Sequence, residues 1–258
     1  MTYPLRDAAT MSRRVFRHAL RYPSTIVMSV GIPAVLLLLF VGVFGDALGA
    51  GFLAGGHGPY VDYVVPGILL MAAGYTASTT ATAVNADMTQ GIIARFRTMA
   101  ITRSAVLVGH VAGAVVRTLI SVALLIGVAL LLGFRPAASP PAWLAVFGVM
   151  ALLVLALAWL AVAIGLAAKN PEGTSGFVII VQVLPFVSSA FLPPAAMSGA
   201  VRAFAQHEPF TPIIDTLRGL LLGTPVGNSG LLAVSWCVGL ALLGYLWSWA
   251  LFRRDPNH

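Results

Sequence analysis

Six long apolar stretches occupy most of this 258-residue sequence and limit what it can fold into. A bilayer core is about 30 Å thick, so a helix needs roughly 20 apolar residues to cross it. Charged residues make up only 9% of the chain and mean hydropathy is +0.94, which excludes a soluble domain of ordinary composition. The sequence therefore predicts an all-α polytopic membrane protein, with residues 1–258 forming a single transmembrane domain. The six expected transmembrane helices are residues 24–45, 63–85, 110–133, 142–166, 176–192 and 230–252.

The basic residues predict the orientation of these helices. Six spans put both termini on one side of the membrane, and that side carries most of the basic residues. Because an excess of Lys and Arg marks cytoplasmic loops, we expect a multi-pass plasma-membrane protein with both termini cytoplasmic. The cytoplasmic set comprises Arg6, Arg13, Arg14, Arg17, Arg21, Arg95, Arg97, Arg103, Lys169, Arg253 and Arg254, and the outer set comprises Arg135, Arg202 and Arg218.

Composition also excludes several kinds of site. The net charge of +7 follows from this asymmetry and gives no reason to expect nucleic-acid binding. Cys237 is the only cysteine, so no internal disulfide can form, and no cluster of His and Cys has the spacing of a metal site. Lys169 is the only lysine and follows Ala168, so the Gly-Lys-Ser/Thr core of a P-loop is absent. Any ATP-driven activity would need an ATPase on another chain.

The N-terminal segment is expected to form an amphipathic interfacial helix over residues 10–22. Arg13, Arg17 and Arg21 recur every four residues on one side. Such a helix lies in the headgroup layer, although these arginines are equally consistent with a simple positive flank of the first span. The first apolar stretch holds about 22 residues, more than the 7–15 of a signal peptide, so we expect it to remain as a helix.

The second span carries a face of small and hydroxylated residues. Tyr75, Ser78, Thr79 and Thr82 fall at helical spacing and share that face. The pattern favours a packed helix interface, with the polar wall of a translocation path as the alternative. Gln182 and Ser188 in the fifth span are further path candidates, although a buried Gln more often donates a hydrogen bond to a neighbouring helix.

Arg117 lies within the third span, on a face similar to that of His110 and Ser121. A charged side chain at a bilayer centre costs about 2.5–3.5 kcal/mol. About 16 residues separate Arg117 from Gly133, roughly 24 Å of helix, so we expect Arg117 near the inner interface, where it can snorkel. An ion relay would need an acidic partner within the membrane, and the sequence indicates none.

Residues 193–229, between the last two spans, are too numerous for a turn and too apolar for a solvated loop. We expect two short helices, broken near Glu208-Pro209, that re-enter the outer leaflet. Backbone cannot lie exposed in lipid, so these helices would have to pack against other spans.

The gap between the second and third spans predicts a cytoplasmic amphipathic helix over residues 87–103. Ile92, Ile93, Phe96, Met99 and Ala100 form an apolar stripe at helical spacing, flanked by arginines. This helix could lie on the membrane or insert its apolar face into a groove of a soluble partner.

This gap also resembles a known family. Residues 87–103 read D-M-T-Q-G-I-I-A-R-F-R-T-M-A-I-T-R, which is similar to the cytoplasmic segment of ABC-2 type permeases, especially the daunorubicin-resistance (DrrB-like) exporter membrane subunits. Ala100 stands where that family usually has Pro. Residues 208–223 resemble a second family segment, and Arg21-Tyr22-Pro23 resembles its Arg-x-Pro before the first span. The matching positions are Asp87, Gly91, Ile92, Arg95, Phe96, Arg97 and Arg103 in the first segment, and Pro209, Thr211, Arg218 and Gly223 in the second.

The resemblance implies a half-transporter that works as a homo- or heterodimer of membrane subunits, each bound to one ABC ATPase subunit. It implies that the first segment is the coupling helix on which the ATPase docks, and that the short outer helices cap the path. ATP and Mg would bind to the ATPase and no cofactor to this chain. The cargo would be a hydrophobic or amphipathic drug, natural product or lipid, exported from a bacterial cell.

Other functions remain open from the sequence. A secondary transporter or channel without an ATPase would be expected to place ionisable groups at mid-membrane, where only Arg117 and His110 are candidates. An intramembrane enzyme would need a nucleophile–base pair, and none can be placed by spacing. A non-transporting membrane scaffold is a further alternative.

Overall fold

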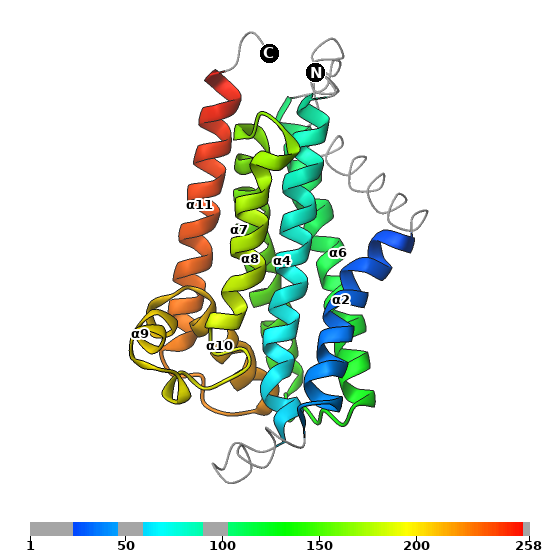
Figure 1. Ribbon diagram of the computed structural model, residues 1–258, viewed down its shortest axis with the longest axis vertical. Helices are drawn as coiled ribbons and strands as arrows, with labels where there is room; N and C mark the ends of the chain where they lie inside the picture. The colour runs from blue at the N-terminus through cyan, green and yellow to red at the C-terminus, as the bar shows by residue number, and fades with distance from the viewer. Residues whose placement is uncertain (1–22, 46–58, 90–102, 255–258) are drawn as a thin grey trace.

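The computed structural model describes residues 23–45, 59–89 and 103–254, and these form helices joined by turns, with no β-strand among them. Five long helices make an elongated bundle, with shorter helices along one side and at one end (Figure 1). The long helices are α2 (Pro23–Gly42), α4 (Tyr60–Thr89), α6 (Arg103–Leu131), α7 (Pro140–Ala167) and α11 (Ser229–Arg254). The short ones are η1 (Pro171–Thr174), α8 (Ser175–Val183), η2 (Leu184–Val187), η3 (Pro194–Ala196), α9 (Gly199–His207) and α10 (Phe210–Leu222).

The prediction of an all-helical polytopic membrane protein is confirmed at this level. Among the described residues, the four helices α4, α6, α7 and α11 are long and apolar enough to cross a membrane. The apolar part of α2 that meets these criteria, Ser29–Gly42, is shorter, and so is Pro171–Val187. The layout with six spans therefore stays a prediction.

The expected fifth span differs from a single helix over 176–192. It is built from η1, α8 and η2 in direct succession, and it ends at Val187. Pro185 lies in η2, where its missing N–H and fixed φ favour the tighter 3-10 turn. The chain then folds back toward α9 and α10, which are separated at Glu208-Pro209. Whether these two helices enter the outer leaflet stays a prediction.

Helices α4 and α7 form the centre of the bundle. In the most apolar window of α4, 83% of the residues are buried, against 17% for α11, so α4 is enclosed by protein whereas α11 presents most of its surface outward. Glycines let α7 approach its neighbours closely. A Cβ on Gly165 would lie 2.7 Å from the carbonyl oxygen of Ala81 in α4, and one on Gly244 of α11 would lie 2.6 Å from the α7 backbone at Leu160.

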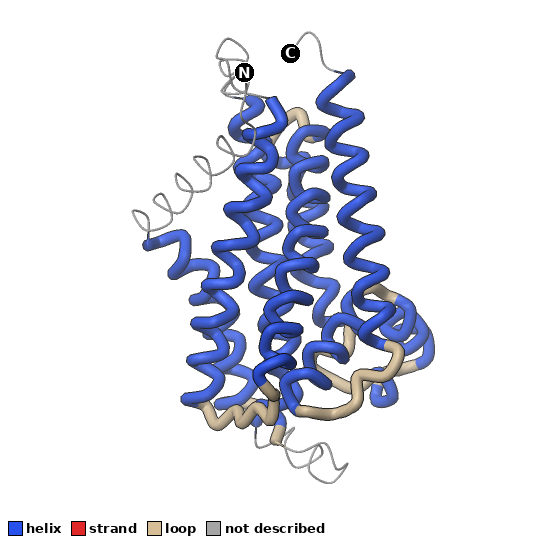
Figure 2. The backbone as a smooth tube through the Cα atoms, turned by 180° about the vertical axis from the view of Figure 1, so that it is seen from behind, coloured by secondary structure: helices blue, strands red, loops and turns tan. Residues whose placement is uncertain are grey.

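The helices run along the long axis of the bundle, so their connections gather at its two ends (Figure 2). One end, called the inner end below, holds the end of α4, the start of α6, the turn from α7 to η1 and the end of α11. The opposite end, called the outer end, holds the start of α4, the turn from α6 to α7, and helices α9 and α10 (Figure 1).

Candidate functional sites at the two ends of the bundle

The expected coupling segment lies only partly within the described residues. Asp87 is in the last turn of α4, and Arg103 is the first residue of α6. The other expected coupling residues, Gly91, Ile92, Arg95, Phe96 and Arg97, lie outside the described residues, as does the expected interfacial helix at 10–22.

Asp87 makes a contact that the sequence analysis missed. Its Oδ2 lies 2.9 Å from Nε2 of His110 on α6, and both side chains are partly exposed. The sequence analysis singled out Asp87 and His110 separately and did not predict this pair. The two residues are 23 positions apart on separate helices, so their pairing depends on how the ends of α4 and α6 meet. The contact joins these helices where the expected coupling segment leaves α4.

Arg117 differs from His110 in this respect. It is partly buried on α6, and its guanidinium makes no hydrogen bond or ion pair within the described part of the chain. One turn further along α6, the Ser121 hydroxyl lies 2.9 Å from that of Ser29, which joins α6 to α2. Among the described residues, Arg117 is thus a cation without a carboxylate partner, beside a polar contact between two helices.

Asn85 connects α4 to the end of α7. Its side chain is fully buried, and its Nδ2 donates to the carbonyl oxygens of Gly165 at 3.2 Å and Ala168 at 2.6 Å. The last carbonyls of a helix have no partner within that helix, so Asn85 caps α7 from a neighbouring element. The sequence analysis did not single out Asn85, because its partners lie about 80 positions away.

The hydroxylated face of α4 is divided between two environments. Ser78 is buried against α8, where Nε2 of Gln182 lies 3.5 Å from its hydroxyl, whereas Thr82 is exposed and Tyr75 and Thr79 are partly exposed. The hydroxyls of Ser78, Thr79 and Thr82 donate to carbonyls of the preceding turn, which satisfies them without another helix. Gln182 links α8 to α4, but its side chain is exposed and not buried as expected.

Ser188 is not part of this face. It is fully buried near the outer end, where its hydroxyl donates to the carbonyl oxygen of Pro185 at 2.7 Å and accepts from the Ala190 amide. Its placement there separates it from the other path candidates on α4 and α8. The role of Tyr75, Ser78, Thr79, Thr82, Gln182 and Ser188 in a substrate path stays a prediction.

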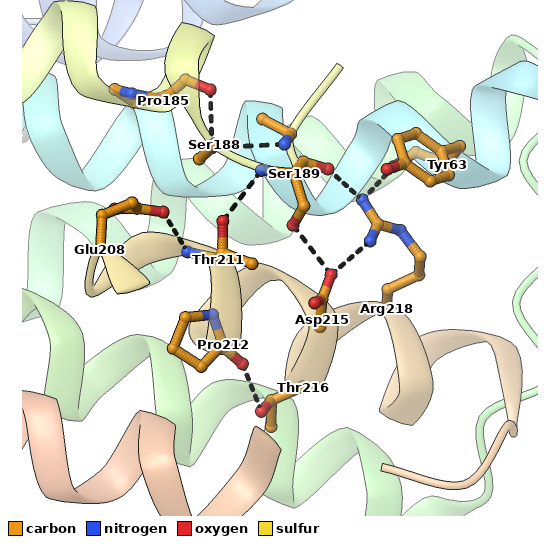
Figure 3. A network of polar contacts seen from close by, with 11 residues as sticks. Tyr63, Pro185, Ser188, Ser189, Glu208, Thr211, Pro212, Asp215, Thr216 and Arg218 are labelled. Atoms are coloured by element: carbon orange, nitrogen blue, oxygen red, sulfur yellow. Dashed lines mark hydrogen bonds and ion pairs between the residues drawn. The ribbon is translucent and has the colours of Figure 1, made fainter. Parts of the chain in front are cut away.

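Arg218 is the centre of a polar network at the outer end (Figure 3). From α10, its guanidinium donates to Asp215 at 2.7 Å, to the carbonyl oxygen of Ser189 at 2.7 Å and to that of Tyr63 at 3.2 Å. It also lies 3.7 Å from the ring centroid of Tyr63, within reach of a cation–π contact. One side chain therefore joins α10, the segment after η2, and the start of α4.

A second set of contacts fixes the same segment to α10. The Ser189 hydroxyl donates to Asp215 at 2.8 Å, and the Ser189 amide donates to the Thr211 hydroxyl at 3.1 Å (Figure 3). The sequence analysis singled out Thr211 and Arg218 but missed Tyr63, Ser189 and Asp215. The spacing of Asp215 and Arg218 by three positions on a helix was a readable signal, whereas Tyr63 and Ser189 gave none.

The start of α10 is capped by a buried carboxylate. Glu208 accepts hydrogen bonds from the amides of Phe210, at 2.7 Å, and Thr211, which would otherwise lack partners at a helix N-terminus. Burial raises the pKa of the Glu208 carboxyl above its usual value, although these hydrogen bonds act in the opposite direction. Pro209 lies between the two helices and presents no N–H in this turn.

Gly223 ends α10 in a left-handed conformation, with φ of +69°. A Cβ there would lie 3.3 Å from the carbonyl oxygen of Ala137 in the turn between α6 and α7. The Ala137 amide in turn donates to the carbonyl oxygen of Leu221 at 2.9 Å. The end of α10 is therefore fitted closely against the outer turn of the bundle.

Within residues 23–45, 59–89 and 103–254, no group of three or more His, Cys, Asp or Glu side chains is placed to hold a metal ion. The polar groups instead form helix-to-helix contacts at the two ends of the bundle, connected along its length by α4. Such contacts can hold the helices in place, and they can also make linked helices move as a unit.

Comparison with known proteins gives the context for these contacts. The sequence matches the family described as ABC-2 type transporter over residues 7–222. It is also 31% identical over 231 residues to the daunorubicin resistance ABC transporter permease protein DrrB1 of Streptomyces coeruleorubidus, covering 88% of this chain and 75% of that protein. The chain belongs to the ABC-2 type transporter family.

A second relative comes from Mycobacterium tuberculosis. It is named as a probable doxorubicin resistance ABC transporter permease protein, DrrC, and is 24% identical over 224 residues, covering 87% of this chain and 81% of the relative. The family match includes the polar contacts at both ends of the bundle, because residues 7–222 contain Asn85, Asp87 and Arg218. Membership of this permease family, together with the apolar helices, makes the chain a multi-pass membrane transport protein.

Proposed function

We propose that this chain is the membrane-spanning permease subunit of an ATP-driven exporter that moves a hydrophobic or amphipathic compound out of a bacterial cell. The observation that carries the proposal is the 31% identity to a drug-resistance permease over most of both chains. A separate ABC ATPase subunit supplies the energy and binds ATP and Mg, and two permease subunits form the transport path as a homo- or heterodimer.

The inner end of the bundle is the proposed docking side for the ATPase. The segment between Thr89 and Arg103 carries the coupling residues Ile92 and Phe96, and α4 and α6, which flank it, are joined by Asp87 and His110. A displacement applied to this segment would act directly on two long helices. In this proposal both termini are cytoplasmic, α2 and the segment of η1, α8 and η2 complete six spans, and α9 and α10 re-enter at the outer face.

The cargo path is proposed along the partly exposed polar side of α4. Tyr75, Thr79 and Thr82 offer hydroxyls on an otherwise apolar surface, and Gln182 extends the polar surface onto α8. Small hydroxylated residues beside apolar helices suit an amphipathic molecule. The drug-resistance names of the relatives are consistent with a cargo of this kind.

The test is to express the permease with its cognate ATPase and measure co-purification, ATP hydrolysis and efflux. Ile92→Asp and Phe96→Asp place a charge on the apolar stripe of the predicted coupling helix. We expect each to uncouple hydrolysis from efflux while membrane insertion is retained. Thr98→Asp places the same charge on the opposite side of that predicted helix and is the matched control.

Normal efflux in both stripe variants would contradict the coupling role. Efflux by the purified permease in liposomes without any ATPase, driven by a proton gradient, would instead support a secondary transporter or channel and would overturn the exporter proposal.

A further inference from the structure

We infer that Asn85 is a positioning residue that makes the inner ends of α4, α7 and α8 move as one body, so that a displacement delivered beyond Thr89 reaches α8 as well as α4. The inference rests on the proposed function, since it concerns how the ATPase stroke spreads through the bundle. It means that the buried Asn85 side chain links the proposed coupling segment to α8, which is distant from it in the sequence.

The first observation is the geometry of the amide. Both acceptors of Asn85 Nδ2 are carbonyl oxygens at the end of α7, and carbonyls only accept, so the side-chain nitrogen must point toward them. Its Oδ1 is buried without a hydrogen-bond partner. A buried unsatisfied acceptor costs about 1–3 kcal/mol. The two hydrogen bonds to α7 offset that cost, whereas an apolar side chain would leave the carbonyl oxygens of Gly165 and Ala168 without this donor.

The second observation is the close backbone approach beside it. Gly165, whose carbonyl accepts from Asn85, faces Ala81 and Val84, and a Cβ at this position would lie 2.7 Å from the Ala81 carbonyl oxygen. The two helix backbones therefore touch within one turn of the amide. Such close packing resists sliding of α4 along α7, and the hydrogen bonds of Asn85 resist separation of the two helices.

The third observation is the short path from α7 to α8. Ala168 is followed by Asn170, whose side chain accepts from the Gly173 amide at 3.0 Å and starts η1. Helix α8 begins at Ser175 directly after η1, without an intervening loop. Because η1 also packs against α4, the end of α7 and the start of α8 form one turn held by α4.

Helix α8 and the segment after η2 then stay in contact with α4 toward the outer end. A Cβ on Gly74 would lie 3.0 Å from Val181, and one on Gly67 would lie 2.5 Å from the Cβ of Ala190. The Arg218 network joins the same two segments through the carbonyls of Tyr63 and Ser189. Helix α6, by contrast, is held to the inner end of α4 by the partly exposed pair of Asp87 and His110.

A distance measurement tests this inference in the assembled transporter with its ATPase. After Cys237→Ser, spin labels are attached at Thr89→Cys, at the end of α4, and at Glu172→Cys in η1, both exposed positions, in only one of the two permease subunits of the complex. We expect one narrow distance distribution that stays the same with and without ATP, while the complex hydrolyses ATP. If the distance between the two labels changes with nucleotide while Asn85 is intact, the inference is overturned, irrespective of the results for the variants.

Replacement of the amide gives the second arm. Asn85→Ala is expected to keep ATPase binding and ATP hydrolysis, to broaden the labelled distance, and to lower efflux per ATP hydrolysed by about tenfold, within the range by which single residues alter coupling. Thr118→Val is the matched control, because Thr118 is also fully buried and its hydroxyl has no hydrogen-bond partner.

Unchanged efflux per ATP in Asn85→Ala would also overturn the inference, and so would an equal loss in Thr118→Val. These outcomes differ from failure of the proposed function. In that case the protein with native Asn85 would bind no ATPase, or would transport without one.

Discussion

At the scale of single residues, Arg218 shows how one side chain can hold three segments. Its guanidinium offers several donors in a fixed plane, and three acceptors from α10, α4 and the segment after η2 surround it. Two of these acceptors are backbone carbonyls, which no substitution of their own side chains would remove. The network therefore depends on Arg218 more than on any of its partners.

Arg218→Met is expected to destabilise the protein by about 2 kcal/mol, because hydrogen bonds to charged groups contribute about 1.5–3 kcal/mol. For a protein of this size that corresponds to a decrease in Tm of about 4–8 °C, measured by thermal unfolding in detergent. Arg202→Met is the control, since Arg202 is exposed and its side chain contacts only nearby carbonyls such as that of Pro194. An equal decrease in both variants would contradict the central role of Arg218.

The same scale shows where sequence reasoning stops. Arg218 and Thr211 could be selected by resemblance, and Asp215 by its spacing from Arg218, because these signals are local. Tyr63 and Asn85 could not, since each acts through the backbone or side chain of a residue about 80 or more positions away. A polar residue in an apolar stretch indicates that a partner exists without indicating which helix supplies it.

At the scale of helices, the sequence predicts long elements well and interrupted ones poorly. Hydropathy locates α4, α6, α7 and α11 because each is a continuous apolar helix of sufficient length. The same signal joined α8, η2 and residues 188–192 into one helix, because an apolar 3-10 turn has the same hydropathy as an α-helix. Glycines mark the close contacts, but their sequence positions alone do not separate Gly165, which faces a backbone, from Gly148, which faces open space.

Gly165→Ala is therefore expected to force α4 and α7 apart and to destabilise the protein by about 1–3 kcal/mol, the usual cost of overpacking. Gly148→Ala lies on the same helix with no atom within 4 Å of the added Cβ. It should be neutral or stabilising, because Ala favours a helix interior over Gly by about 1 kcal/mol. Thermal unfolding of both variants tests the contrast, and equal Tm values would show that the two helices are not in such close contact.

At the scale of the whole molecule, the two ends of the bundle differ in how they are held. The outer end is fixed by the networks of Arg218 and Glu208, whereas the inner end of α4 is fixed strongly to α7 and by one partly exposed pair to α6. The inner end is also where the proposed coupling segment follows α4. A transporter driven from that end would combine an outer part held by buried polar networks with a polar link to α6 that water can reach, and such links contribute little to stability.

The proposed six-span layout predicts on which side of the membrane each end lies. Charge asymmetry predicts that the C-terminal end of α4 and the α7–η1 turn lie in the cytoplasm and that the turn before α11 lies outside. In intact cells, a membrane-impermeant thiol reagent should therefore label Asn228→Cys, and should label Thr89→Cys and Glu172→Cys only after the membrane is opened. All three positions are exposed, and the native Cys237 is buried, so its background labelling should be low. Labelling of Thr89→Cys and Glu172→Cys on opposite sides would mean that the end of α4 and the α7–η1 turn do not share the inner end, and the layout would be wrong.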